Sequence, residues 1–196
     1  VATTLARSDH SHSHGNRGGG SLHTNAVSGG AAGFMSGTDK ATLDRLAALA
    51  RVRANANSAQ TFVAGAGSTV MQYNDDSSLA THFYDSQSNY DPTTYRFTAP
   101  RTGYYHVSGT IRCSKSGGGA WTAGDALAIS VEKNGGTLLW EGASFKAWAA
   151  LSASAEVNWA TTIILTAGDY IEAKADASGA SNFVVSKGYL QVDELP

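Results

Sequence analysis

The stretch ALAISVEKNGGTLLWEG, residues 126–142, decides the fold class. Its first half alternates apolar and polar side chains, which places Leu127, Ile129 and Val131 on one face of an extended strand. The dipeptide Asn-Gly at 134–135 follows, and both of its residues readily adopt the positive φ of a two-residue hairpin turn. Apolar residues then resume, so the sequence predicts an antiparallel β-hairpin.

The sequence on both sides of this hairpin continues as strands. Residues 104–111, YYHVSGTI, place Tyr105 and Val107 on one face and mostly polar side chains on the other. Two more strands are predicted within 158–179, around an Ala-Gly-Asp turn, and a last strand or pair within 182–195. Turn residues recur roughly every ten positions with no helix between the strands. We therefore expect a mainly β, antiparallel jelly-roll fold, and an α/β fold is excluded.

A single helix is predicted before the strands, over residues 38–53. The segment SGTD at 36–39 has the spacing of a capping box, and Leu43, Leu46 and Ala50 recur at helical intervals. This apolar stripe is narrow, and an isolated helix of about 15 residues is only marginally stable in water. We therefore expect the helix to pack on copies of itself through this stripe.

The composition limits the partners of the chain. Among its 196 residues are 14 basic and 16 acidic side chains, so the net charge of -2 creates no field that would attract nucleic acid or an anionic membrane. No apolar run approaches the ~18 residues of a membrane span, and the N-terminal residues lack the apolar core of a secretory signal. We expect no nucleic-acid partner and no membrane insertion. Because the chain begins with Val1 rather than Met, we expect further residues upstream.

The pattern divides the chain into three regions. Residues 1–37 lack apolar periodicity and are expected to form an extended connector. Residues 38–57 are expected to form a short helical neck, and residues 58–196 a jelly-roll head. The single cysteine, Cys113, cannot form an internal disulfide, so the head must be held together by its core.

The head resembles the globular heads of complement C1q-like and tumour-necrosis-factor-like proteins. In that family an aromatic residue, a proline and the motif Gly-x-Tyr-x-apolar follow one another, and the matching residues here are Phe97, Pro100, Gly103, Tyr105 and Val107. Three further motifs follow in the family's order: V-x-x-N-G at 131–135, L-x-x-G-D-x-I at 165–171 and a loose S-x-G-x-L at 186–190. The resemblance covers about 62–195 and implies a jelly roll that assembles as a homotrimer, in which the predicted helix would line a threefold axis. The sequence before this head lacks the collagen-like stalk that is typical of the family.

The region before the head resembles a segment of tail-fibre and other appendage proteins of bacteriophages. There a His-x-His region, the motif GFMS-x-x-D-K-x-x-L-D, found here at 33–44, and a terminal head follow one another. The resemblance implies a trimeric receptor-binding tip on a virion, assembled in the host cytoplasm. Its N-terminal end would contact other virion proteins, and its head a host-cell glycan or protein. Two alternatives stay open: a structural capsid head fibre or decoration protein, and, more distantly, a bacterial surface or spore-type adhesin.

Three histidines alternate within SDHSHSHGN at 8–16. In an extended strand His10, His12 and His14 share one face, so three chains would direct six or nine imidazoles to a common axis. Six nitrogen ligands suit an octahedral ion such as iron(II) or nickel(II) better than zinc. Phage fibres resembling this chain use His-x-His pairs in this way, which implies a structural transition-metal ion in the trimer. A flexible, solvated connector is the alternative interpretation of the same residues.

Four polar connections are expected to form the end of the head opposite the shaft: 85–92, 114–125, 141–154 and 176–182. The side chains predicted to be available there for receptor binding are Asp85, Asn89, Tyr90, Lys115 and Trp121. By contrast, we expect Trp140 and Trp148 in the core or a subunit interface.

No catalytic pattern stands out in the sequence. His82 and His106 could be paired with Asp85 or Asp91, but no nucleophile elbow or pair of carboxylates in a defined context accompanies them. The glycine-rich segment at 116–125 lacks the Lys-Ser/Thr ending of a phosphate-binding loop. We therefore expect a binding protein rather than an enzyme.

Overall fold

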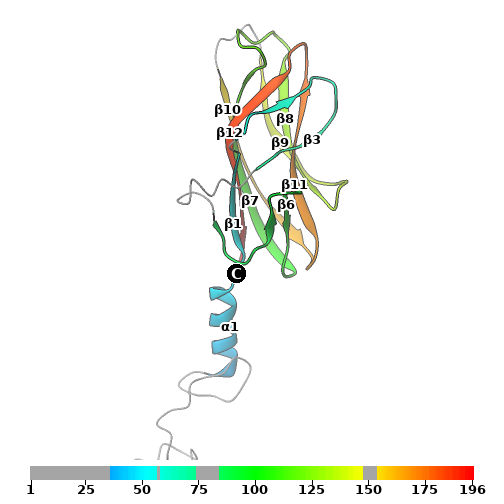
Figure 1. The fold of residues 1–196 in the computed structure, drawn as a ribbon. Coiled ribbons are helices and arrows are strands. Elements are labelled where there is room, and N and C mark those ends of the chain that lie inside the picture. Colours follow the sequence, from blue (N-terminus) through cyan, green and yellow to red (C-terminus); the bar gives the residue numbers. More distant parts are fainter. Residues whose placement is uncertain (1–35, 57, 74–83, 148–153) are drawn as a thin grey trace, which may run out of the picture. The chain divides into compact units, whose positions relative to one another are not determined.

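The computed structural model describes residues 36–56, 58–73, 84–147 and 154–196. The chain divides into two compact units, Val1–Ala47 and Ala48–Pro196, and the second unit is called the head below. Figure 1 shows the helix α1 in the first unit and two layers of strands in the head. The predicted metal ligands His10, His12 and His14 lie outside the described residues.

The helix α1 spans Gly37–Ala47. Its predicted capping box is confirmed, because the Asp39 N–H donates to Ser36 Oγ at 3.0 Å and the Ser36 N–H donates to Asp39 Oδ2 at 3.3 Å. Leu43 and Leu46 are 49% and 40% exposed in the single chain. The predicted stripe is therefore available for packing.

The helix ends six residues earlier than the predicted boundary at 53. Residues Arg51–Ala56 form the strand β1, in which Val52 and Ala54 are fully buried in the core of the head. Ala50, which was expected on the neck axis, is also fully buried there, so its placement in the neck was wrong. The head thus begins at Ala48 rather than at 58.

One antiparallel sheet, called sheet A, has the strand order β10-β7-β12-β1-β4, with β2 paired to β12. Its remaining strands are β2 (Gln60–Phe62), β4 (Tyr84–Asp85), β7 (Gly103–Lys115), β10 (Ala155–Leu165) and β12 (Phe183–Glu194). The other antiparallel sheet, called sheet B, has the order β5-β6-β11-β8-β9, with β3 paired to β11. Its strands are β3 (Thr69–Val70), β5 (Tyr90–Asp91), β6 (Arg96–Thr98), β8 (Ala126–Lys133), β9 (Thr137–Lys146) and β11 (Tyr170–Ser178).

The core lies between the two sheets. It is formed by the apolar residues that alternate with polar residues along the strands. Every second residue of β7 and β8 is buried, including Tyr105, Val107 and Ile129, which are fully buried. The hairpin predicted from 126–142 is β8 and β9, joined by a turn in which Asn134 has a φ of 52°. The predicted mainly β, antiparallel fold is confirmed.

The head has two ends, which the strand register defines. At one end, called the entry end, the chain enters at Ala48, and Arg51 of β1 pairs with Asp193 of β12. At the opposite end, called the far end, Lys115 of β7 pairs with Phe183 of β12. Loops can therefore be assigned to an end from the strands that they join.

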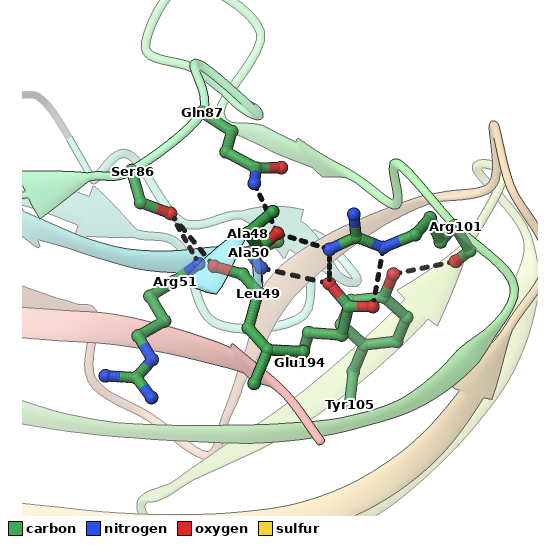
Figure 2. A network of polar contacts seen from close by, with 9 residues as sticks. All are labelled: Ala48, Leu49, Ala50, Arg51, Ser86, Gln87, Arg101, Tyr105 and Glu194. Atoms are coloured by element: carbon green, nitrogen blue, oxygen red, sulfur yellow. Dashed lines mark hydrogen bonds and ion pairs between the residues drawn. The ribbon is translucent and has the colours of Figure 1, made fainter. Parts of the chain in front are cut away.

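A buried carboxylate fixes the entry of the chain, as Figure 2 shows. Glu194, which is 7% exposed, accepts hydrogen bonds from the Ala50 N–H at 2.9 Å, from Arg101 Nε at 2.9 Å and from Arg101 Nη2 at 2.6 Å. The carbonyl of Ala48 accepts from Arg101 Nη2 and from Gln87 Nε2. These five residues are called the entry clamp. They hold the first residues of the head against its last strand.

Candidate functional site

The far end gathers three connections around one buried carboxylate. Asp125 is fully buried and follows the loop 116–124 between β7 and β8. Its Oδ2 accepts from the Thr122 N–H at 2.8 Å, and its Oδ1 accepts from the N–H groups of Ala180 and Ser181, between β11 and β12, at 2.9 and 3.0 Å. Its carbonyl accepts from the Ala147 N–H, just after β9. Asp125 therefore sets the positions of these loops relative to one another.

The ionised form of Asp125 is favoured by these contacts. Burial acts to raise its pKa, but the hydrogen bonds from Ser181, Thr122 and Ala180 together outweigh burial and lower the pKa below its ordinary value. The far end is thus held by a carboxylate that stays charged at neutral pH.

A shallow groove of about 550 Å³ opens beside this anchor. Its lining is made of small side chains, one lysine and glycine backbone: Ser114, Lys115, Gly117, Gly118, Gly119, Ala120, Ser154 and Val184. The three glycines have φ values of 78°, 77° and 88°, which side chains with a Cβ rarely adopt. Because they carry no side chains, this wall exposes backbone groups that can donate and accept hydrogen bonds. The surface of the groove is mostly apolar, and its polar groups are the Lys115 ammonium, the serine hydroxyls and the glycine backbone.

Lys115, one of the predicted receptor-binding residues, lies at this groove. Its Nζ donates to the Ala120 carbonyl at 3.1 Å and lies 3.5 Å from Thr122 Oγ1. The ammonium group thus bridges the glycine-rich loop and contributes a positive charge to the groove.

Trp121 is buried rather than exposed, so the expectation of an exposed aromatic residue was wrong. Its side chain is 2% exposed, and its ring centroid lies 4.5 Å from that of Phe183 and 5.1 Å from that of Phe145. The surrounding loop is mostly glycine and polar residues, so the indole ring is the group that can attach it to the core. The indole ring of Trp121 therefore anchors the loop 116–124 to the core of the head.

The loop at 85–92 lies at the entry end, contrary to its predicted place beside 114–125. The strand β4 pairs with the start of β1, and the Ser86 N–H donates to the Arg51 carbonyl at 3.0 Å. Asp85 Oδ1 accepts from the Asn89 N–H at 3.0 Å and Oδ2 from the Tyr90 N–H at 2.8 Å, so this carboxylate organises its own loop. The sequence alone shows how long a loop is. It does not show at which end of the folded head the loop lies.

Tyr90 is also buried, at 6% exposed, which contradicts its expected exposure. Its hydroxyl donates to the Tyr73 carbonyl at 2.9 Å, and burial raises the pKa of the phenol. Asn89 is partly buried. Asp85, Asn89 and Tyr90 therefore do not share a surface with Lys115.

Trp140 closes the side of the head where β9 and β10 meet. It is partly buried and stacks on Trp159 at a centroid distance of 5.6 Å, as expected for a core or interface residue. Gly109 of β7 makes room for Trp159, because a Cβ there would lie 2.6 Å from the indole. Trp148 lies outside the described residues.

The outer face of sheet A carries exposed apolar groups that lack cover in the single chain. Tyr104 and Ile164 face each other across β7 and β10 and are both 58% exposed, and Tyr84 is 41% exposed. The Arg53 guanidinium lies 4.1 Å from the ring centroid of Tyr189 on the same face. An apolar surface of this kind favours contact with another molecule.

The described residues hold no cluster of three or more His, Cys, Asp or Glu side chains that could bind a metal ion. His106 lies on the outer face of sheet A, opposite Asp193 in β12, and His82 lies outside the described part of the chain. No helix within the described residues has the length and apolar character that crossing a membrane requires.

Comparison with known proteins identifies the fold. No family model matches the sequence, and no curated protein matches it. Among solved structures, the globular domain of zebrafish complement 1qA protein is 13% identical, with a TM-score of 0.53 over 76% of this chain and 98% of that one. Eiger TNF from S. frugiperda is 10% identical, with a TM-score of 0.50 over 76% of this chain and 93% of that one. At such low identity the likeness concerns the fold alone: the head has the C1q/TNF-like jelly-roll fold.

Proposed function

We propose that the chain is the receptor-binding tip of a homotrimeric bacteriophage fibre, which binds a glycan or protein on the host-cell surface without catalysing a reaction. The observation that carries this proposal is the groove at the far end. It lies opposite the end at which the preceding chain enters the head, so it would be the part of a fibre that first meets a cell. The C1q/TNF-like fold and the phage-type sequence segment at 33–44 support the same proposal.

The proposed trimer is supported by the outer face of sheet A. Tyr104 and Ile164 expose more than half of their side chains there, and covering them with a neighbouring copy would remove apolar surface from water. Leu43 and Leu46 of α1 would add a second apolar contact between copies. Three grooves on one tip would give avidity even if each bound weakly.

The proposed contact with the receptor can be tested by filling the groove. Ala120 is exposed and lines it, whereas Ala167 is exposed in the turn between β10 and β11 at the entry end. We expect full-length Ala120→Arg to lose about tenfold or more of its binding to host cells and to a printed bacterial glycan array, because the added side chain occupies the groove. Ala167→Arg should bind like the wild type.

Two results would reject the receptor-binding role. Equal binding by both variants would show that the groove is not used. An absence of binding by the wild-type trimer to cells and glycans would favour the alternative function, a structural capsid head fibre or decoration protein.

A further inference from the structure

Basic side chains of two neighbouring strands lie beside the groove at the far end. Arg112 of β7 and Lys187 of β12 are direct cross-strand neighbours, and both are exposed on the outer face of sheet A. The Arg112 Nε donates to Ser154 Oγ at 3.0 Å, and Ser154 lines the groove. The groove is therefore bordered by the Arg112 guanidinium in addition to the Lys115 ammonium group.

These three positive charges are only partly balanced. None of the ion pairs formed within the described part of the chain involves Arg112, Lys115 or Lys187. One carboxylate lies in register with them, that of Glu156 in β10, which is the other cross-strand neighbour of Arg112 and is exposed. Three positive charges therefore face one negative charge, which leaves an excess of two positive charges beside the groove.

The remaining parts of the far end do not supply the missing negative charge. Four connections at this end contain neither Asp nor Glu. They are 63–68, 116–124, 147–154 and 179–182. Asp125 is fully buried, and its carboxylate already accepts three backbone N–H groups. On sheet B the exposed Lys146 and Asp176 carry opposite charges, so the excess of positive charge belongs to the side of the groove.

The lining of the groove indicates what else the ligand must carry. Its apolar surface, to which Ala120 and Val184 contribute, suits the C–H face of a sugar ring, and the hydroxyls of Ser114 and Ser154 can bind sugar hydroxyls. A neutral saccharide would remove water from the basic groups without replacing it by a partner. A carboxylate or phosphate group would instead form charge-assisted hydrogen bonds with them. The groove therefore favours an anionic saccharide over a neutral one.

The basic groups are separate from the apolar surface assigned to the proposed trimer contact. Tyr104 and Ile164 face each other across β7 and β10 near the entry end. Arg112 lies eight residues further along β7 than Tyr104, which corresponds to about 26 Å. Copies that pack through the apolar pair can therefore leave the groove open.

We propose that the groove binds an anionic saccharide of the host surface, whose carboxylate or phosphate groups pair with Arg112 and Lys115 while a sugar ring packs on Val184. This inference rests on the proposed receptor-binding function and names the chemical class of the receptor. Lys187 lies outside the lining of the groove, so its charge would attract the ligand and speed its association more than it would strengthen the complex.

The printed bacterial glycan array tests the class of ligand. We expect the full-length wild type to bind glycans that carry carboxylate or phosphate groups, and the bound glycans show which of these two groups is recognised. A neutral derivative of a bound glycan, with its carboxyl group reduced to an alcohol or its phosphate removed by phosphatase, should bind about tenfold or more weakly, because the charge-assisted hydrogen bonds are lost.

Variants of the basic residues test where the anion binds. We expect Arg112→Gln and Lys115→Gln each to weaken binding of the anionic glycan by about tenfold, and Arg112→Lys to retain most of it because the charge is kept. Arg51→Gln removes an exposed positive charge at the entry end and should bind like the wild type. If Lys115→Gln lowers the melting temperature through its lost loop contacts, Arg112→Gln alone decides.

The outcomes separate this inference from the proposed function. A wild type that binds neither host cells nor glycans would reject the receptor-binding function. Binding of neutral glycans only, or binding to cells that withstands periodate oxidation of their sugars, would overturn the anionic saccharide and leave the receptor-binding function in place. Equal affinity for an anionic glycan and its neutral derivative, or equal binding by wild type and Arg112→Gln, would also contradict the inference alone.

Discussion

At the scale of single residues, the far end depends on one buried carboxylate. Asp125 accepts hydrogen bonds from the N–H groups of Thr122, Ala180 and Ser181, and its pKa is lowered in the folded protein. A carboxyl group whose pKa is lowered by folding stabilises the protein above its unfolded pKa of about 3.9 and loses that contribution as the pH falls through the folded value. We therefore expect the difference in melting temperature between wild type and Asp125→Asn to be largest near neutral pH and to shrink below about pH 4. A difference that stays constant down to pH 2 would show that ionisation of Asp125 is not involved.

Trp121 contributes to the far end through the packing of its buried ring against the core, and it offers no exposed surface for a ligand. Replacing it with alanine removes the ring that contacts Phe145 and Phe183, and we expect a loss of about 3–5 kcal/mol in the free energy of unfolding. Trp121→Phe keeps an aromatic ring at the same place and should cost much less. Chemical denaturation measures both values, and a Trp121→Ala variant as stable as the wild type would contradict the buried position.

The predicted metal site at the histidines can be tested separately, also at the scale of single residues. If His10, His12 and His14 hold a structural metal ion in the trimer, metal analysis after purification in metal-replete buffer should find about one ion per trimer. Chelation should then lower the melting temperature. A trimer with much less than one bound ion would favour the solvated connector.

At the scale of the elements, α1 is the part whose stability we expect to depend on other copies. Its exposed stripe contains Leu43 and Leu46, and a helix of this length is marginal alone. We expect Leu43→Asp with Leu46→Asp to lower the melting temperature of the trimer by about 5 °C or more, because the charges would lie in the neck. Ala41→Asp, which places the charge on the opposite face of the same helix, is the control. An unchanged melting temperature in the leucine variant would show that the head alone determines assembly.

The elements also differ in whether neighbouring residues in the sequence are enough to predict them. The β8–β9 hairpin was predicted because its strands and its Asn134 turn lie next to each other in the chain. The strand β1 was missed because RVRANA continues the helical spacing of the preceding residues, while its partner β12 lies about 140 positions away. A second pairing, of β4 with β1 across about 30 positions, places the loop 85–92 at the entry end, which no local pattern could indicate.

At the scale of the whole molecule, the candidate site was only partly predictable. The glycine-rich loop and Lys115 were predicted, because glycines and a lysine between two strands indicate an adaptable surface loop. Sequence could not reveal that Trp121 turns inward, since burial depends on the aromatic cluster with Phe145 and Phe183 from two other strands. Arg112 and Lys187 likewise become neighbours only once the strands β7 and β12 are paired.

The central claim is that the head forms the free tip of a fibre. Electron microscopy of intact virions, with the chain located by antibody labelling, tests it most directly. We expect threefold-symmetric heads at the outer ends of fibres, with the loop 116–125 directed away from the particle. Heads lying flat against the capsid, with the far end covered by other virion proteins, would contradict the receptor-binding role.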